Sequence, residues 1–485
     1  MLKIQAYFVY FAEGELYLGL TEIVGGLNDR LLAIVWGTPM LILIVGSGIY
    51  FTLRCRGVQF VHFGYAMKNT IGRIFEKNSA GEGEISPFQA VTTALAATVG
   101  TGNIAGVTGA IVLGGPGSIF WLWMVSLIGM CVKYAEVVLA VKYRERNEQG
   151  DRVGGPMYYI TGGLGKNWRW LALTFSAFGA LAAFGIGNAV QVRQISASMS
   201  MLISAYRPDF AGGGAVGWAV GIVVAAIVAA TLLGGIKRLG QVTEKLVPIM
   251  SIIYIVATLA VIVVNIEKLG SVLSMIFEAA FNPAAVGGGV AGFTLIQCIS
   301  LGVKRGVFSN EAGLGSAPIA HAASSETNPV KQGMFGIFEV FADTIVICTL
   351  TALALLMSGI AIPYGNEELG NISLNGAAFA SIFGEKTAGI ILAIGISFFA
   401  LATVLSWGLY GSRCCEYIFG SRSIKPYQVV FALVAIVGAV MRESLAWEIS
   451  DSLNGLMAIP NLIALLGLSG VVARLTQEHF RRGAN

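Results

Sequence analysis

The sequence predicts an all-α protein that crosses a membrane many times. Of its 485 residues, 55% are hydrophobic and only 12% are charged, whereas about a quarter of an ordinary soluble chain is charged. A helix needs about 20 apolar residues to cross a bilayer, and stretches of that length recur along the whole chain. These stretches are continuously apolar, which favours helices over the alternating strands of a barrel.

Eleven stretches are predicted to span the membrane. They run approximately from 31 to 53, 87 to 113, 117 to 142, 170 to 204, 215 to 234, 244 to 265, 286 to 314, 334 to 358, 387 to 412, 427 to 441 and 455 to 475. We divide the chain into 1–86 (the first spanning helix and an amphipathic helix on the inner surface), 87–285 (a first repeat of five helices) and 286–485 (a second, inverted repeat and a cytoplasmic tail).

The basic residues predict the orientation. If the loop after the first span is cytoplasmic, 23 of the 31 Lys and Arg residues fall in inner loops, six fall on the outer side and two lie within spans. Cytoplasmic loops carry an excess of Lys and Arg. We therefore expect a multi-pass protein of the plasma (inner) membrane, with the N-terminus outside and the C-terminus in the cytoplasm.

Two spans are interrupted by glycines and polar residues. The first contains "ATVGTGNIAG" (97–106), and the other contains "FTLIQCISLGVKRGVFSNEAGLGS" (293–316). Each begins one set of five spans, and transporters built from inverted repeats bind substrate at broken helices in corresponding positions. Free N–H groups at the start of a half-helix suit a carboxylate, whereas free carbonyls suit a cation. The pair predicts a site for a zwitterion and a co-transported cation.

Three separated motifs carry a family resemblance: "TALAATVGTGNIAGV" (93–107), "GGPMYYI" (154–160) and "GVKRGVFSNEAGLGSAPIAHA" (302–322). They resemble the alanine/glycine:cation symporter family. The resemblance implies a LeuT-type five-plus-five core of the amino acid-polyamine-organocation superfamily, preceded by one extra helix. It implies sodium-coupled symport of alanine and glycine into the cell by alternating access. Sodium is then the coupling ion, with no organic cofactor, no enzyme activity and no nucleic-acid partner.

The resemblance also implies a substrate site. The predicted substrate-binding residues are Thr98, Thr101, Gly102, Asn103, Phe293, Thr294, Gln297 and Trp407. The N–H groups of Thr101 and Gly102 would hold the substrate carboxylate, with Asn103 beside it. Carbonyl groups around Thr98 and the side chain of Gln297 would meet the ammonium group. Phe293 and Thr294 would wall the pocket, and Trp407 would cap it or simply pack.

The family pattern implies a sodium site made of backbone carbonyls and hydroxyls. The predicted ligands are the carbonyls of Ala96 and Val99 and the hydroxyl of Thr403. The family favours a Ser-Thr pair on this later helix, but Ala402 stands where the serine is expected. The substitution removes one hydroxyl ligand, so the ligand set and the sodium selectivity stay open.

Ionisable residues inside spans need partners or a water-lined face. The candidates for gating are Arg193, Lys304, Arg305, Glu311 and Asp343. Arg193 is expected in an outer gate, and Lys304, Arg305 and Glu311 are expected after the second interruption, near the inner mouth. Asp343 suits either cation coupling or structural hydrogen bonding. Lys133 and Glu136 lie one turn apart and are expected to form an ion pair.

Several alternatives remain open at this stage. The segment "GTGNIA" (100–105) fits a dinucleotide-binding pattern, but it lacks the preceding strand and the later acidic residue of that fold. "GGPMYYI" suits either turn chemistry or gating. Proton coupling, a preference for glutamine or serine, a channel and an intramembrane enzyme are rival functions. Sequence alone leaves the oligomeric state open, and a monomer is compatible with it.

Overall fold

The computed structural model describes residues 31–32, 35–73, 83–207, 209, 213–282, 294–366, 372–441 and 443–482. Within these residues, eight helices are long and apolar enough to cross a membrane, and one bent pair of helices makes a ninth span. The predicted multi-pass helical fold is confirmed, whereas the count of eleven spans stays a prediction. The first predicted span is a shorter apolar helix, α2 (Thr38–Arg54), and the second interrupted span is divided into two helices.

The main helices follow the predicted spans in order. In the first half they are α5 (Pro87–Thr98), α6 (Ala105–Gly114), α7 (Ser118–Lys142), α9 (Arg169–Phe184), α10 (Val190–Tyr206), α11 (Gly213–Leu232) and α12 (Gly235–Val264). In the second half they are α15 (Leu295–Asn310), α16 (Ala317–Ala322), α17 (Pro329–Val340), α18 (Thr349–Met357), α20 (Glu385–Phe419), α21 (Ile424–Val440) and α22 (Glu443–Arg482). π-Helical turns join α9 to α10 (η5, Gly185–Ala189) and α17 to α18 (η7, Phe341–Cys348).

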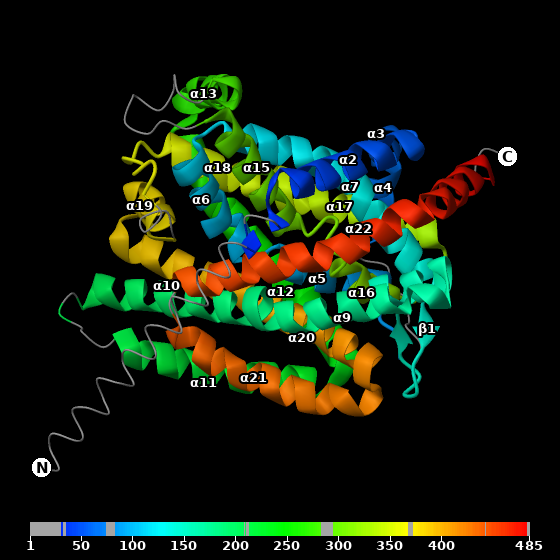
Figure 1. The fold of residues 1–485 in the computed structure, drawn as a ribbon. Coiled ribbons are helices and arrows are strands. Elements are labelled where there is room, and N and C mark those ends of the chain that lie inside the picture. The colour runs from blue at the N-terminus through cyan, green and yellow to red at the C-terminus, as the bar shows by residue number, and fades with distance from the viewer. Residues whose placement is uncertain are drawn as a thin grey trace, which may run out of the picture.

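Shorter elements cover the two ends of the bundle. One end carries α3 (Val58–Val61), α4 (Phe63–Thr70), η1 (Ile71–Arg73), the strands β1 (Glu145–Arg146) and β2 (Arg152–Val153), α8 (Pro156–Tyr159), η3 (Ile160–Leu164), η4 (Lys166–Trp168) and η9 (Ser421–Ser423). The other end carries η6 (Ile266–Lys268), α13 (Leu269–Phe281) and α19 (Ile372–Phe383). We call them the hairpin end, after β1 and β2, and the α13 end (Figure 1). The helix α13 was not predicted.

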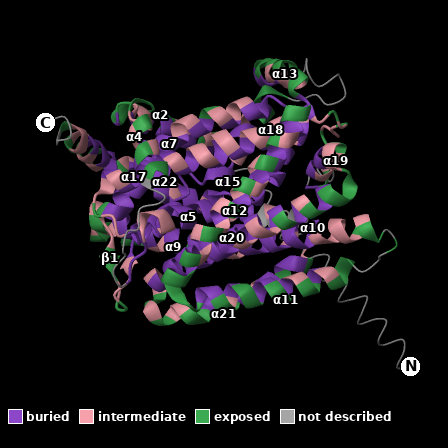
Figure 2. Cartoon of the chain, turned by 180° about the vertical axis from the view of Figure 1, so that it is seen from behind, coloured by how far each residue is buried: buried purple, intermediate pink, exposed green. Residues whose placement is uncertain are grey.

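The long helices lie side by side, with α11 and α21 along one side of the bundle and α2 and α7 along the other (Figure 1). Helix α10 packs on α20, α15 packs on α7, and α5 contacts α12, α16 and α20. Figure 2 shows buried residues concentrated in the middle of the bundle and exposed residues on the flanking α11 and α21. The two interrupted helix pairs, α5 with α6 and α15 with α16, therefore run through the middle of the molecule.

Both interrupted pairs begin with the same local signal. Ser86 and Gln89 form a capping box at the start of α5, and Thr294 and Gln297 form one at the start of α15. A capping box satisfies two N–H groups that have no partner in the first helical turn. Helix α5 starts at the hairpin end and α15 at the α13 end, so the two pairs run in opposite directions.

Candidate functional site

The first interrupted helix breaks at its glycines. Helix α5 ends at Thr98, and two non-helical residues and a 3-10 turn, η2 (Thr101–Asn103), follow before α6 leaves at an angle of 53°. A Cβ atom on Gly100 would lie 2.5 Å from Thr403 Oγ1 on α20. Only glycine lets the unwound backbone come this close to the hydroxyl.

The second break lies directly after Asn310, at the end of α15. Glu311 has a φ of 56°, and Gly313 and Gly315 have φ values of 91° and 82°, before α16 begins at Ala317. Positive φ is uncommon for a residue with a side chain and costs free energy unless the surroundings hold it. Contacts of the Glu311 carboxylate supply that support.

The prediction placed the second break too early in the chain. Thr294 and Gln297 form the exposed cap of α15, and Gln297 precedes Glu311 by about 20 Å along the helix at 1.5 Å per residue. Their sequence pattern signals a helix start, which the prediction overlooked. Phe293 lies outside the described residues. The structure therefore does not bring Thr294 or Gln297 to the breaks.

Asn103 links the first break to the end of α15, just before the second break. Its Oδ1 accepts a hydrogen bond from the N–H of Gly100 at 2.8 Å, which closes the first break on itself. Its Nδ2 donates to Ser309 Oγ on α15 at 2.9 Å and to Asp343 Oδ1 in η7 at 2.6 Å. Three elements that are distant in sequence thus converge on one buried amide.

Asp343 is a buried carboxylate surrounded by neutral donors. Besides Asn103, the hydroxyls of Ser309 and Thr344 donate to its Oδ2 at 2.8 Å and 2.7 Å. Among the described residues, Asp343 takes part in no ion pair, and it is 0% exposed. Burial of an unpaired charge is expensive. The site therefore suits a bound cation.

The predicted sodium ligands lie between α5 and α20. Thr403 Oγ1 donates to the carbonyl of Ala96 at 2.9 Å and to that of Phe399 at 3.1 Å. Val99 follows directly after α5 and is buried. Ala402 is fully buried beside Thr403 and contributes no oxygen. Carbonyl and hydroxyl oxygens therefore lie close together here, but the serine hydroxyl that the family pattern places at position 402 is missing.

Gln191 is a site residue that the sequence reasoning did not select. Thr101 Oγ1 donates to Gln191 Oε1 at 2.9 Å, and Gln191 Nε2 donates to the carbonyl of Ile186 in η5 at 3.0 Å. A π-helical turn shifts the side chains that follow it, and such turns are frequent at functional sites. The available signal was the polar and glycine pattern "GIGNAVQ" (185–191) inside an apolar span.

Trp407 contacts the second break. Its Nε1 donates to Glu311 Oε1 at 2.8 Å, and Ser316 Oγ donates to the other carboxylate oxygen. Trp407 is fully buried, and the backbone of Gly187 in η5 packs directly against its side chain. Glu311 therefore lies in the break itself and connects it to α20, instead of lining an inner mouth.

Lys304 and Arg305 precede the second break, on its α13 side, which corrects the placement predicted for them. Lys304 Nζ lies 2.6 Å from Asp451 Oδ2 on α22, and Arg305 Nη1 lies 3.9 Å from Asp451 Oδ1. Lys304 also faces the ring of Trp36, and Arg305 faces that of Trp447 at 5.1 Å. This cluster ties α15 to α22 between the α13 end and the breaks.

Two other predicted residues, Thr98 and Arg193, do not bond to the described groups around Asn103. Thr98 turns its hydroxyl back onto its own helix, 3.3 Å from the carbonyl of Ala94. Arg193 is half-buried in α10 and forms no ion pair within the described ranges. Its gating role stays a prediction.

Lys133 and Glu136 do not pair with each other as predicted. Lys133 Nζ lies 3.4 Å from Glu339 Oε1 on α17, whose other oxygen lies 3.1 Å from His321 Nε2. Glu136 instead accepts the N–H groups of Gly313 and Gly315. Both N–H groups reach one oxygen of Glu136 from the second break, so contacts between elements, and not spacing along α7, decide its partners.

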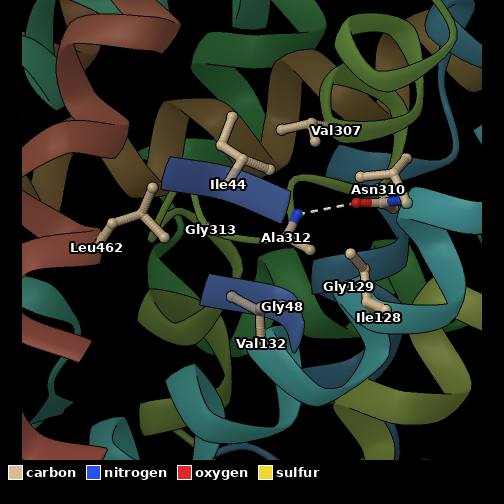
Figure 3. A pocket seen from close by; sticks show the side chains of 11 residues that line it. Ile44, Gly48, Ile128, Gly129, Val132, Val307, Asn310, Ala312, Gly313 and Leu462 are labelled. Atoms are coloured by element: carbon tan, nitrogen blue, oxygen red, sulfur yellow. Dashed lines mark hydrogen bonds between the residues drawn. The ribbon is translucent and has the colours of Figure 1, made fainter. Parts of the chain in front are cut away.

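The second break packs tightly against α7 and α2. Figure 3 shows Asn310, Ala312 and Gly313 beside Gly129 and Ile44, with Asn310 Oδ1 accepting the N–H of Ala312 at 2.9 Å. The cavity among these residues is about 10 Å³, roughly the volume available to one water centre. This face of the break is therefore packed against α7 and α2, whereas the polar groups that meet Asn103 lie on α15 and η7.

A model of the sodium:alanine symporter family matches residues 21–485. The chain belongs to this family. It is 45% identical over 445 residues to the Sodium/alanine symporter AgcS of Methanococcus maripaludis, which covers 91% of this chain and 94% of that protein. It is 35% identical over 466 residues, 96% of this chain and 91% of the relative, to a Bacillus subtilis protein named "Probable sodium/glutamine symporter GlnT".

Solved structures agree with the fold of this sodium:alanine symporter family member. The structure of MhsT in complex with L-phenylalanine matches with a TM-score of 0.56 and 14% identity, over 82% of this chain and 99% of MhsT. The predicted LeuT-type fold is therefore confirmed. As a member of the family, the chain is a multi-pass membrane transporter and not an enzyme.

Proposed function

We propose that this transporter carries alanine and glycine into the cell together with sodium, by alternating access between the two ends of the bundle. The hairpin end would face the cytoplasm, because basic residues of its loops, such as Arg144, Arg146 and Arg152, follow the positive-inside rule. The N-terminus would then lie outside and the C-terminus inside, in the plasma (inner) membrane.

The observation that carries the proposal is the amide of Asn103, which closes the first break and bonds to Ser309 at the end of α15 and to Asp343 in η7. The N–H groups of Thr101 and Gly102 lie at the start of a new helical segment, where no intrahelical acceptor exists. They suit a carboxylate. Gln191 bonds to Thr101 beside these groups, and the fully buried Trp407 follows Thr403 by one turn of α20; a site bounded by these two large side chains would favour a substrate with a small side chain.

Sodium would bind at one or both of two oxygen-rich places. The first is the predicted site of Thr403 Oγ1 with the carbonyl of Ala96, to which Val99 would add a carbonyl. The second is Asp343 with the hydroxyls of Ser309 and Thr344, where a cation would balance the unpaired carboxylate. A cation bound there would also orient Asn103, so sodium and substrate would each raise the other's affinity.

Alternating access needs closures on both sides of the breaks. On the α13 side, Asp451 would hold Lys304 and Arg305 until the path opens. At the hairpin end, Arg144 donates to the carbonyls of Ser324 and Glu326 at 2.7 Å and 2.8 Å. Burial, with Arg152 nearby, lowers the pKa of Arg144 to about 10, so it stays charged at neutral pH.

Uptake of labelled amino acids into proteoliposomes tests the proposal. Alanine and glycine should accumulate when a sodium gradient is imposed, and not when the gradient is dissipated. Uptake driven by a proton gradient in the absence of sodium would indicate proton coupling. Uptake of labelled glutamine or serine in preference to alanine would indicate one of the rival substrates. Uptake that ignores both gradients would overturn symport and favour a channel.

A further inference from the structure

The carboxylate of Glu136 on α7 is the fixed support of the second break. Its Oε1 accepts hydrogen bonds from the N–H groups of Gly313 and Gly315 at 3.1 Å and 3.0 Å, and from Asn461 Nδ2 on α22 at 2.6 Å. Asn461 Nδ2 also donates to the carbonyl of Gly313 at 2.8 Å. Two neighbouring N–H groups that converge on one oxygen form an anion-binding concavity in the backbone.

A tyrosine from the hairpin end fixes this arrangement. The hydroxyl of Tyr159, on α8, donates to Asn461 Oδ1, and both side chains are fully buried. A hydrogen bond to the amide oxygen turns the amide nitrogen of Asn461 toward Glu136 and the carbonyl of Gly313. Tyr159 thus acts on the break through Asn461, without touching Glu136.

The segment around Tyr159 also packs against the second break and α16. A Cβ atom on Gly315 would lie 2.6 Å from Pro156 Cγ, and one on Gly155 would lie 2.7 Å from Ile319 Cγ1 on α16. Gly155 has a φ of 122°, which a side chain would strain. The motif "GGPMYYI" (154–160) is therefore built to fit the break, beyond its local turn chemistry.

We propose that Tyr159, Asn461 and Glu136 form a positioning relay that couples the second break to α8 at the hairpin end. The relay holds the N–H groups of Gly313 and Gly315 on Glu136 while the hairpin end is closed. Helix α16 can move away from α7 only when these hydrogen bonds break or when α8 moves together with α16. The role in the transport cycle rests on the proposed symport. The effect on the break itself does not.

Hydrogen exchange in the whole protein in nanodiscs tests the relay without transport. In Tyr159→Phe, amides 313 and 315 should exchange three- to tenfold faster than in the wild type. Tyr158→Phe is the matched control, because Tyr158 packs on Tyr417 and should leave both amides unchanged. Glu136→Gln keeps an acceptor oxygen and should be milder than Glu136→Ala. Equal protection in the wild type and in Tyr159→Phe would overturn the relay.

Transport assays then separate a positioning role from a merely structural one. We expect Tyr159→Phe to bind sodium and alanine within about twofold of the wild type, while net uptake falls at least fivefold. Alanine uptake that is absent from the wild type itself would refute the proposed symport and leave the exchange result to decide the relay. Wild-type uptake rates in Tyr159→Phe would refute the coupling to transport.

Discussion

The two broken helices are held in different ways. The first break itself supplies only neutral groups: the hydroxyl of Thr101, which bonds to Gln191, and the amide of Asn103, which bonds to Ser309 and to the Asp343 carboxylate. The second break is held by two carboxylates, Glu311 to α20 and Glu136 from α7. Neutral hydrogen bonds are exchanged for ligand contacts at low cost, whereas a buried carboxylate that loses its partners costs more. The first break therefore suits ligand binding, and the second suits support.

The largest effect should follow Asn103→Ala, which removes the amide that joins the first break to α15 and η7. We expect uptake of alanine under a sodium gradient to fall at least 20-fold, because the first break loses its closure and Asp343 loses a donor. The matched control is Asn69→Ala in α4, whose amide only caps a local carbonyl. Normal uptake in Asn103→Ala would move the binding site away from the first break.

Asp343→Asn should give the next largest effect, on the sodium requirement. A neutral amide no longer balances a cation, so the half-saturating sodium concentration should rise at least tenfold. Alanine affinity measured at saturating sodium should change less. The measurement is the sodium dependence of alanine binding by scintillation proximity. An unchanged sodium dependence would leave the Thr403 site as the place of coupling.

Glu311→Gln tests the support role of the second break. In the wild type, Trp407 and Ser316 each donate to one oxygen of the Glu311 carboxylate. The glutamine amide has a single acceptor oxygen and no charge, so it can accept from only one of these donors. We expect net uptake to fall about three- to tenfold while sodium-dependent alanine binding stays within about twofold. If binding falls as far as uptake does, the second break is a ligand site as much as the first, and the comparison fails.

The smallest effect is expected for Gln297→Ala. Gln297 is exposed and caps α15 at the α13 end, so its loss should leave uptake within about twofold and lower stability slightly, as caps do. Uptake and thermal unfolding of the variant give both numbers. A loss of most uptake would restore the substrate contact that the sequence predicted for this residue.

The sequence located the first break correctly because its signal is local. Glycines and an asparagine in the middle of an apolar span lower its helix propensity at one place, and the residues from Thr98 to Asn103 lie at that interruption in the structure. The second segment carries glycines both before and after its charged residues. Nothing in the linear pattern says which set unwinds, so the break was placed about 20 Å too early.

The sequence by itself determined the membrane class, the helical fold and the first broken helix, because the length of an apolar stretch and the glycines within it act over one segment at a time. Three motifs carried the resemblance to the family. Only the tertiary structure decided the partners of the buried charges. Lys133 pairs with Glu339 and not with Glu136, and Glu136 reaches Gly313 and Gly315 across the helix interface. Spacing along one helix reports which residues share a face, but neighbouring helices decide which buried donor a carboxylate finds.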